Sequence, residues 1–161
     1  MEPIYTALFL IPTIWVGPFW LLMMVEPKSE RTSKWVEGNL IFLGPLIAYF
    51  VTILVDPDGM IDLFTGNPAE IMDTMVVLLG TESGTVLAWA HFVAGDIIAT
   101  RWMWRKAVEN EIGLNQTRVI VFFGVMLMPV GLLLHMALNR DCVLMYLNLG
   151  SFLDTYSTLE S

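Results

Sequence analysis

Long apolar runs separated by short polar segments dominate this chain. A bilayer core is about 30 Å thick, so a helix that spans it needs about 20 apolar residues. Four segments approach that length, over residues 4–25, 36–55, 86–104 and 119–138. The pattern predicts an all-α membrane protein, with residues 1–138 forming one domain of four transmembrane helices.

Six of the eight Lys and Arg residues lie in two of the connecting segments, while Arg101 lies inside the third span and Arg140 follows the last one. The segment between the first two spans holds Lys28, Arg31 and Lys34. The segment between the last two spans holds Arg105, Lys106 and Arg118. The connection over 56–85 has no Lys or Arg and six acidic residues. Because basic loops stay on the cytoplasmic side, we predict that both termini lie outside, in the periplasm or lumen.

The outer connection has a pattern of its own. Residues 56–59 read Asp-Pro-Asp-Gly, which favours a turn, and the apolar residues over 71–79 then recur near helical spacing. This predicts a short amphipathic helix lying in the outer interface, with a strand-like lid as the alternative. The tail over 139–161 is apolar in part but too short to span, so we expect it to dock on the outer side.

Composition agrees with a membrane protein. Hydrophobic residues make up 56% of the 161 residues and charged residues 15%, against about 25% charged in soluble domains. These values exclude a soluble enzyme, a disordered chain and a nucleic-acid binder, which would carry a basic face. The net charge of −8 reflects acidic residues placed mainly outside, and the single cysteine, Cys142, excludes a disulfide framework.

Apart from Glu37 at the edge of the second span, the acidic, basic and histidine side chains inside the predicted spans are His91, Asp96, Arg101 and His135. An ionisable group at the bilayer centre costs roughly 3 kcal/mol and is a functional candidate by default. Asp96 lies near the midplane, and the two histidines lie at similar depths on neighbouring spans. A spacing of five residues turns a helix by about 140°, so His91, Asp96 and Arg101 do not form one stripe. Asp96 must therefore find a partner on another helix, stay protonated, or meet Arg101 through a bent side chain.

Structural interpretations compete with these functional ones. Asp96 could make an interhelical hydrogen bond, either histidine could be a bundle residue, and Arg101 could anchor the helix at the interface. No metal site is predicted, because no HxxH or ExxH spacing occurs, whereas one histidine, His91 or His135, would suffice as axial ligand to a chlorophyll-type or haem pigment. Prolines inside the spans predict kinks that open crevices for a long apolar ligand; they are Pro12, Pro18, Pro45 and Pro129.

Two of the spans resemble a known family. Residues 89–102 read W-A-H-F-V-A-G-D-I-I-A-T-R-W, which resembles the W-x-H-x-x-A-x-D-x-x-x-x-R signature of the abscisic-acid-deficient, or neoxanthin-synthase-like, membrane family. Pro129, Gly131 and His135 match the family's P-x-G-x-x-x-H, and residues 18–23 fit its first span. The resemblance covers about residues 8–138.

The resemblance implies carotenoid chemistry. Plant members are chloroplast membrane proteins required to convert violaxanthin to neoxanthin, an opening of an epoxide to an allenic alcohol that needs no cofactor. On that basis we expect Asp96 to act as base, His91 as acid, His135 to orient or substitute for it, and Arg101 to stabilise the cluster. No plastid transit sequence is evident, so we expect a bacterial relative in an inner or photosynthetic membrane.

A non-catalytic role is the alternative. The chain would then be a pigment-binding or accessory subunit of a larger membrane complex, such as a photosynthetic one, with His91 or His135 holding the pigment. Its expected partners are membrane lipid, a carotenoid and the other subunits of that complex, and no nucleic acid. A purely structural four-helix spacer is a third possibility.

Overall fold

The computed structural model describes residues 2–138, and the regular elements of this part of the chain are all helices. In chain order they are α1 (Pro3–Val25), α2 (Glu30–Val36), η1 (Asn39–Phe42), α3 (Leu43–Val55), α4 (Asp58–Thr65), η2 (Pro68–Glu70), α5 (Ile71–Leu79), α6 (Glu82–Glu109), α7 (Leu114–Met126) and α8 (Met128–Leu138). The all-α fold class is confirmed. The predicted tail over 139–161 lies outside the described residues.

One described helix, α1, is both long and apolar enough to cross a bilayer. It has 23 residues and a mean hydropathy of 2.0, and it begins with Pro3 in its first turn, where the missing N–H costs nothing. Two further stretches reach this length only as bent pairs: α2 with η1 and α3, bent by 49°, and η2 and α5 with α6, bent by 98°. By length and composition these residues provide one to three crossings, and the expected four stay a prediction.

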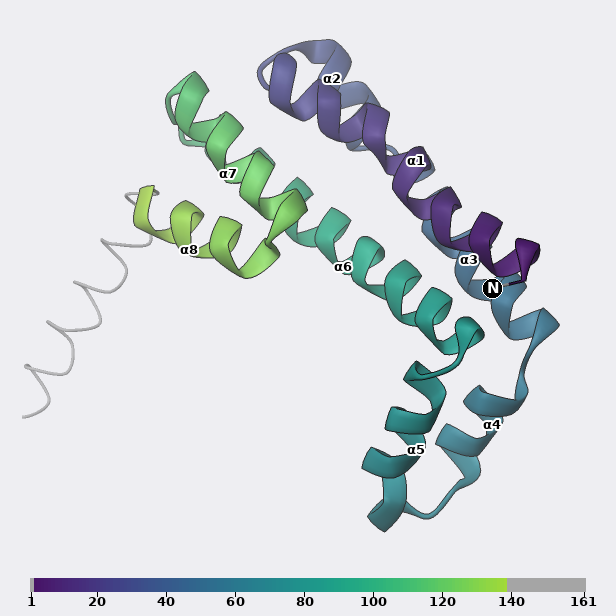
Figure 1. The fold of residues 1–161 in the computed structure, drawn as a ribbon. Helices are drawn as coiled ribbons and strands as arrows, with labels where there is room; N and C mark the ends of the chain where they lie inside the picture. Colours follow the sequence, from purple (N-terminus) through teal and green to yellow (C-terminus); the bar gives the residue numbers. More distant parts are fainter. Residues whose placement is uncertain (1, 139–161) are drawn as a thin grey trace, which may run out of the picture.

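The prediction of one helix over 119–138 is wrong. The chain leaves helical geometry at Leu127 (φ −148°, ψ 75°), where α7 ends, and α8 then turns back beside α7 (Figure 1). Pro129 falls in the first turn of α8, and because proline has no backbone N–H it could not bond to the Val125 carbonyl as a continuous helix requires. Glycine allows the close approach, because a Cβ on Gly131 would run into the backbone of Gly124.

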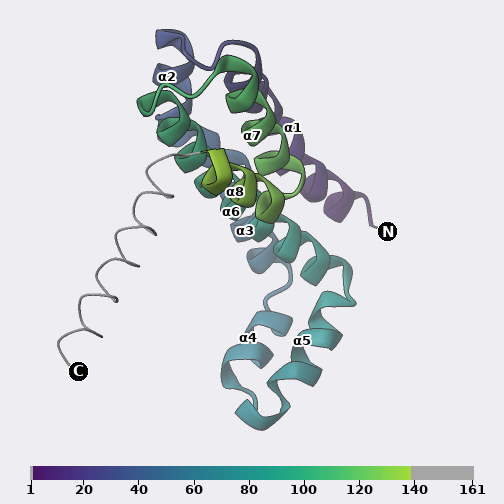
Figure 2. The same ribbon diagram turned by 90° about the vertical axis from the view of Figure 1, so that its left-hand side faces the viewer.

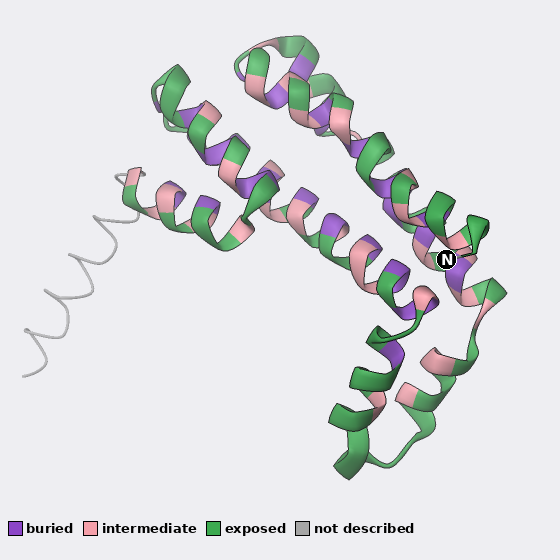
Figure 3. Cartoon of the chain, viewed as in Figure 1, coloured by how far each residue is buried: buried purple, intermediate pink, exposed green. Residues whose placement is uncertain are grey.

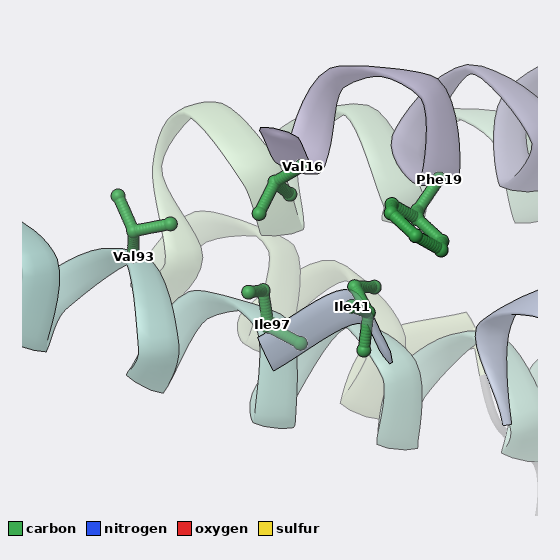
Figure 4. Close-up of a cluster of buried hydrophobic side chains, with 5 residues drawn as sticks. All are labelled: Val16, Phe19, Ile41, Val93 and Ile97. Atoms are coloured by element: carbon green, nitrogen blue, oxygen red, sulfur yellow. The ribbon is translucent and has the colours of Figure 1, made fainter. Parts of the chain in front are cut away.

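The long helix α6 lies at the centre of the fold and packs against α1, α3, α5, α7 and α8. Figure 4 shows one buried cluster, in which Val16 and Phe19 of α1 face Val93 and Ile97 of α6, with Ile41 of η1 between them. Two further clusters continue the core, formed by Met23, Val36, Trp104 and Val121, and by Met103, Ala107, Ile112 and Ile120.

The connection between α3 and α6 forms a helical hairpin of α4 and α5 that projects from the bundle (Figure 2). The short helix predicted there is present as α5. The turn expected over 56–59 is wrong for its second half, because α4, which the pattern did not predict, already begins at Asp58. The alternative of a strand-like lid is wrong. Most of the hairpin surface is exposed (Figure 3), and its location in the membrane interface stays a prediction.

The two ends of the molecule differ in charge. At one end the Trp104 indole N–H donates to the Pro27 carbonyl (2.9 Å), which joins the α1–α2 connection to the end of α6. Within residues 2–138, all seven Lys and Arg residues lie at this end. At the other end the Glu2 backbone N–H donates to the Glu82 carboxylate (2.7 Å), and the acidic α4–α5 hairpin lies beyond it (Figure 1).

Candidate functional site

The four side chains predicted as a site are not gathered in one place. His91, Asp96 and Arg101 all project from α6, at successive steps of five residues and hence from different faces of the helix. Arg101 donates to the backbone carbonyl of Glu37, at 2.9 Å. Arg101 also lines a small cavity, and none of the other three residues lies on its walls.

Asp96 is the predicted residue whose surroundings remain unusual. It is half-buried, and no hydrogen bond or ion pair of its side chain is found within residues 2–138. One helical turn further on, Thr100 is fully buried, and its hydroxyl has no hydrogen-bond partner among the described residues either. A polar stripe of Asp96 and Thr100 therefore runs along one side of α6.

The two histidines lie in contrasting environments. His91 is exposed and makes an edge contact with Phe92, with ring centroids 6.4 Å apart. His135 on α8 is 0% exposed and packs edge-on against Trp102, at 4.9 Å and 65°. Trp102 follows Asp96 by six residues, about 9 Å along α6 and 120° around it. The residue of α6 that His135 contacts therefore lies on a different face of this helix from Asp96.

These positions bear on pigment and metal binding. A flat macrocycle could not reach the His135 ring without displacing its packing, whereas His91 is accessible as an axial ligand. In the part of the chain that the structure describes, no three His, Cys, Asp or Glu side chains form a group suited to a metal ion.

A long apolar groove runs along α1 and was not located from the sequence. Its volume is about 770 Å³, and Arg31, at its α2 end, is the only charged residue on its walls. The lining residues are Ala7, Leu10, Ile11, Ile14, Trp15, Pro18, Phe19, Leu22, Arg31, Trp35 and Leu40. The prolines of the first span indicated a crevice, but the partners that form its other wall, α2 and η1, depend on the tertiary fold.

The Trp15 side chain fixes the position of this groove. Its indole N–H donates to the Leu40 carbonyl at 2.8 Å, which ties α1 to η1. Gly44, at the start of α3, packs under the same side chain, and a Cβ there would lie 2.5 Å from the Trp15 Cβ. Since only glycine fits at this contact, the wall formed by Trp15 is set by backbone approach.

Two polar cavities lie at opposite ends of the molecule. One, of about 250 Å³, is bounded by Phe42, Ile98, Arg101, Trp102 and Arg105. The other, of about 590 Å³, lies in the α4–α5 hairpin and has five carboxylates on its walls, from Asp56, Asp58, Asp62, Glu70 and Asp73. The first therefore favours anions and the second cations.

Comparison with known proteins adds to this geometry. The family described as ABA DEFICIENT 4-like matches residues 7–135. Among curated proteins, the chain is 30% identical over 135 residues to Protein ABA DEFICIENT 4, chloroplastic, from Arabidopsis thaliana. The match covers 82% of this chain and 60% of that relative, so the chain spans about three fifths of the relative's length. No solved structure matches the chain.

Proposed function

The chain belongs to the ABA DEFICIENT 4-like family, and from this premise we propose that it is a carotenoid-linked membrane protein that binds a xanthophyll along α1. The observation that carries the proposal is the apolar groove. A xanthophyll is a rigid polyene with oxygenated end rings, so it needs a long apolar surface and a polar group at an end.

The groove meets both requirements. From Ala7 to Leu22, the walls extend about 22 Å along α1 at 1.5 Å per residue. The volume of about 770 Å³ falls within the usual range for small-molecule sites, about 300–1,000 Å³. At the α2 end, the Arg31 guanidinium can donate to an oxygen of the end ring, and the half-exposed Trp35 indole can pack on it.

Pigment analysis with a groove-filling variant tests this function. The protein is produced in a host that makes a defined xanthophyll, then purified, and its pigment is extracted and quantified by chromatography. We expect near-stoichiometric xanthophyll in the parent protein. Ile14 lines the groove and its side chain is 68% exposed, so Ile14→Trp places an indole where the pigment would lie. Overpacking between indole and pigment costs about 1–3 kcal/mol, and pigment content should therefore fall about tenfold.

The control is Leu21→Trp, the same kind of change on the same helix. Leu21 is 62% exposed but does not line the groove, so its pigment content should match that of the parent. Equal pigment loss in both variants, or no specific pigment in the parent protein, would reject binding in this groove. Pigment retained without conversion supports the pigment-binding or accessory-subunit role.

A second candidate function is xanthophyll epoxide-to-allene isomerisation, favoured by the half-buried Asp96 without a bonded partner in the described chain. The reaction moves one proton from a chain carbon to a base, cleaves the epoxide C–O bond and protonates the released oxygen, with no net redox change. Asp96 is the proposed base. The positions of His91, His135 and Arg101 do not support acid, orienting or stabilising roles beside it.

The two candidates respond to different substitutions. Asp96 does not line the groove, so catalysis by Asp96 requires the reacting end of the polyene to lie against α6. Asp96→Asn should then abolish conversion, a loss of about 100-fold or more for a general base, while pigment content stays unchanged. Conversion at the parental rate would remove Asp96 from the mechanism, and the Ile14→Trp result would stand independently.

A further inference from the structure

The cavity near the C-terminal half of α6 carries two guanidinium groups that the proposed function does not use. Arg101 and Arg105 lie one helical turn apart, and both line this cavity of about 250 Å³. Arg101 uses one N–H for the Glu37 carbonyl, whereas a guanidinium has five N–H donors. Donors therefore remain for a ligand.

Among the described residues, Glu37 forms an ion pair with Arg105, and Glu109, which binds Lys106, interacts with Arg105 at longer range. Glu37 Oε1 lies 3.7 Å from Arg105, longer than a hydrogen bond, and the two side chains are 44% and 48% exposed. Such an exposed ion pair contributes little and exchanges readily. Arg105 is therefore available to an anion that binds more closely than Glu37 does.

The other walls of the cavity are apolar. They comprise Phe42 from η1, the 61% exposed Ile98 and the 45% exposed Trp102. Ile98 lies one turn from Trp102 toward the middle of α6, so an apolar surface continues from the cavity into the predicted span. A ligand that fits both parts has an anionic head on the arginines and an apolar chain over Ile98.

We propose that this cavity binds the phosphate headgroup of an anionic membrane phospholipid. Membrane proteins bind such headgroups in basic pockets between helices, Arg pairs well with phosphate oxygens, and Trp is common at this depth. A free phosphate would gain nothing from Ile98 and Phe42. The site shares no lining residue with the α1 groove, so it does not depend on xanthophyll binding.

Native mass spectrometry of the detergent-purified chain tests the proposal. The chain is titrated with phosphatidylglycerol, with phosphatidylcholine as the zwitterionic comparison and glycerol phosphate as the headgroup alone. We expect saturable binding of phosphatidylglycerol at low stoichiometry, at least tenfold weaker phosphatidylcholine binding, and no saturable binding of glycerol phosphate. Equal binding of both lipids, or glycerol phosphate binding as tight as that of the lipid, would overturn it.

Three variants locate the site, after circular dichroism confirms parental helix content. Arg105→Gln removes one guanidinium and should weaken phosphatidylglycerol binding about tenfold, the effect of losing one charge-assisted hydrogen bond. Lys34→Gln makes the same charge change at an exposed residue of α2 that does not line the cavity, so it should bind as the parent does.

Glu37→Gln supplies a prediction of opposite sign. It removes the carboxylate that competes for Arg105 but keeps the backbone carbonyl that holds Arg101, so phosphatidylglycerol should bind several-fold more tightly. If Lys34→Gln weakens binding as much as Arg105→Gln, the attraction is general surface charge. If Glu37→Gln weakens binding, the arginines are not the lipid site, and either result rejects the proposal.

Discussion

Side chains from other helices bind the carbonyl groups at the C-terminal end of α1. Arg118 donates from Nε to Met24 O (2.8 Å) and from an Nη to Val25 O (3.0 Å). The last carbonyls of any helix lack intrahelical partners, and a cation there also interacts favourably with the helix dipole. Arg118 thus joins α7 to α1, because its side chain binds a backbone oxygen of a residue 93 positions earlier in the chain.

Replacing Arg118 should destabilise the fold. Arg118→Gln removes a charged donor from two carbonyls, and we expect the free energy of unfolding to fall by about 2 kcal/mol, measured by thermal unfolding in detergent. Lys34→Gln makes the same charge change at an exposed residue of α2 and should have little effect. An equal loss in both variants would show that net charge, and not these hydrogen bonds, sets the difference.

The candidate residues differ in how far their surroundings could be foreseen. The partial burial of Asp96 follows from its place on an apolar helix, whereas its depth near the bilayer midplane stays a prediction. The burial of His135 against Trp102 could not be foreseen, because it depends on α8 turning back. Arg101 was expected either to stabilise an acid cluster or to anchor the helix, and its bond to the Glu37 carbonyl supports the anchoring interpretation.

The break between α7 and α8 is the element-level feature that most changes the expected fold. A run of apolar residues over 119–138 has the length of a span, and Pro129 alone indicates only a kink. The reversal is possible because two glycines allow close contacts, one between α7 and α6 and the other between α8 and α7. A Cβ on Gly124 would lie 2.8 Å from both the Thr100 hydroxyl and the Met103 methyl carbon, and Gly131 packs on the Gly124 backbone.

A single methyl group tests this packing. Gly131→Ala places a Cβ against the backbone of Gly124, which cannot move aside cheaply, so we expect a loss of about 1–3 kcal/mol in stability. Gly17→Ala, inside α1, is the matched control because nothing lies within 4 Å of its Cβ, and the higher helix propensity of alanine should leave stability unchanged or slightly raised. Thermal unfolding in detergent measures both, and a neutral Gly131→Ala would contradict the close α7–α8 contact.

The whole molecule has a basic end and an acidic end. The two basic connections meet at the C-terminal ends of α1 and α6, through Trp104 and Arg118, while the α4–α5 hairpin lies at the opposite end (Figure 2). By the positive-inside rule, we propose that the basic end faces the cytoplasm or stroma and the hairpin the periplasm or lumen.

Cysteine accessibility checks this orientation. In a Cys142→Ser background, which removes the only native cysteine, Asp73→Cys probes the hairpin and Lys34→Cys the basic end, both at exposed positions. A membrane-impermeant maleimide added to intact cells should label Asp73→Cys and reach Lys34→Cys only after the membrane is disrupted. The reverse labelling pattern would invert the topology, and labelling of both in intact cells would exclude a crossing between them.

The features that could be predicted from the sequence are those that depend on residues close together in the chain. Hydrophobic length, charge placement and the motif on α6 are properties of consecutive residues, so they were enough for the helical class, the family and the central helix with Asp96. The α1 groove, the α7–α8 reversal and the paired arginines beside Glu37 join residues distant in the chain. They depend on which helices approach each other and how closely, and that is fixed by side-chain volume and backbone contact across the folded chain.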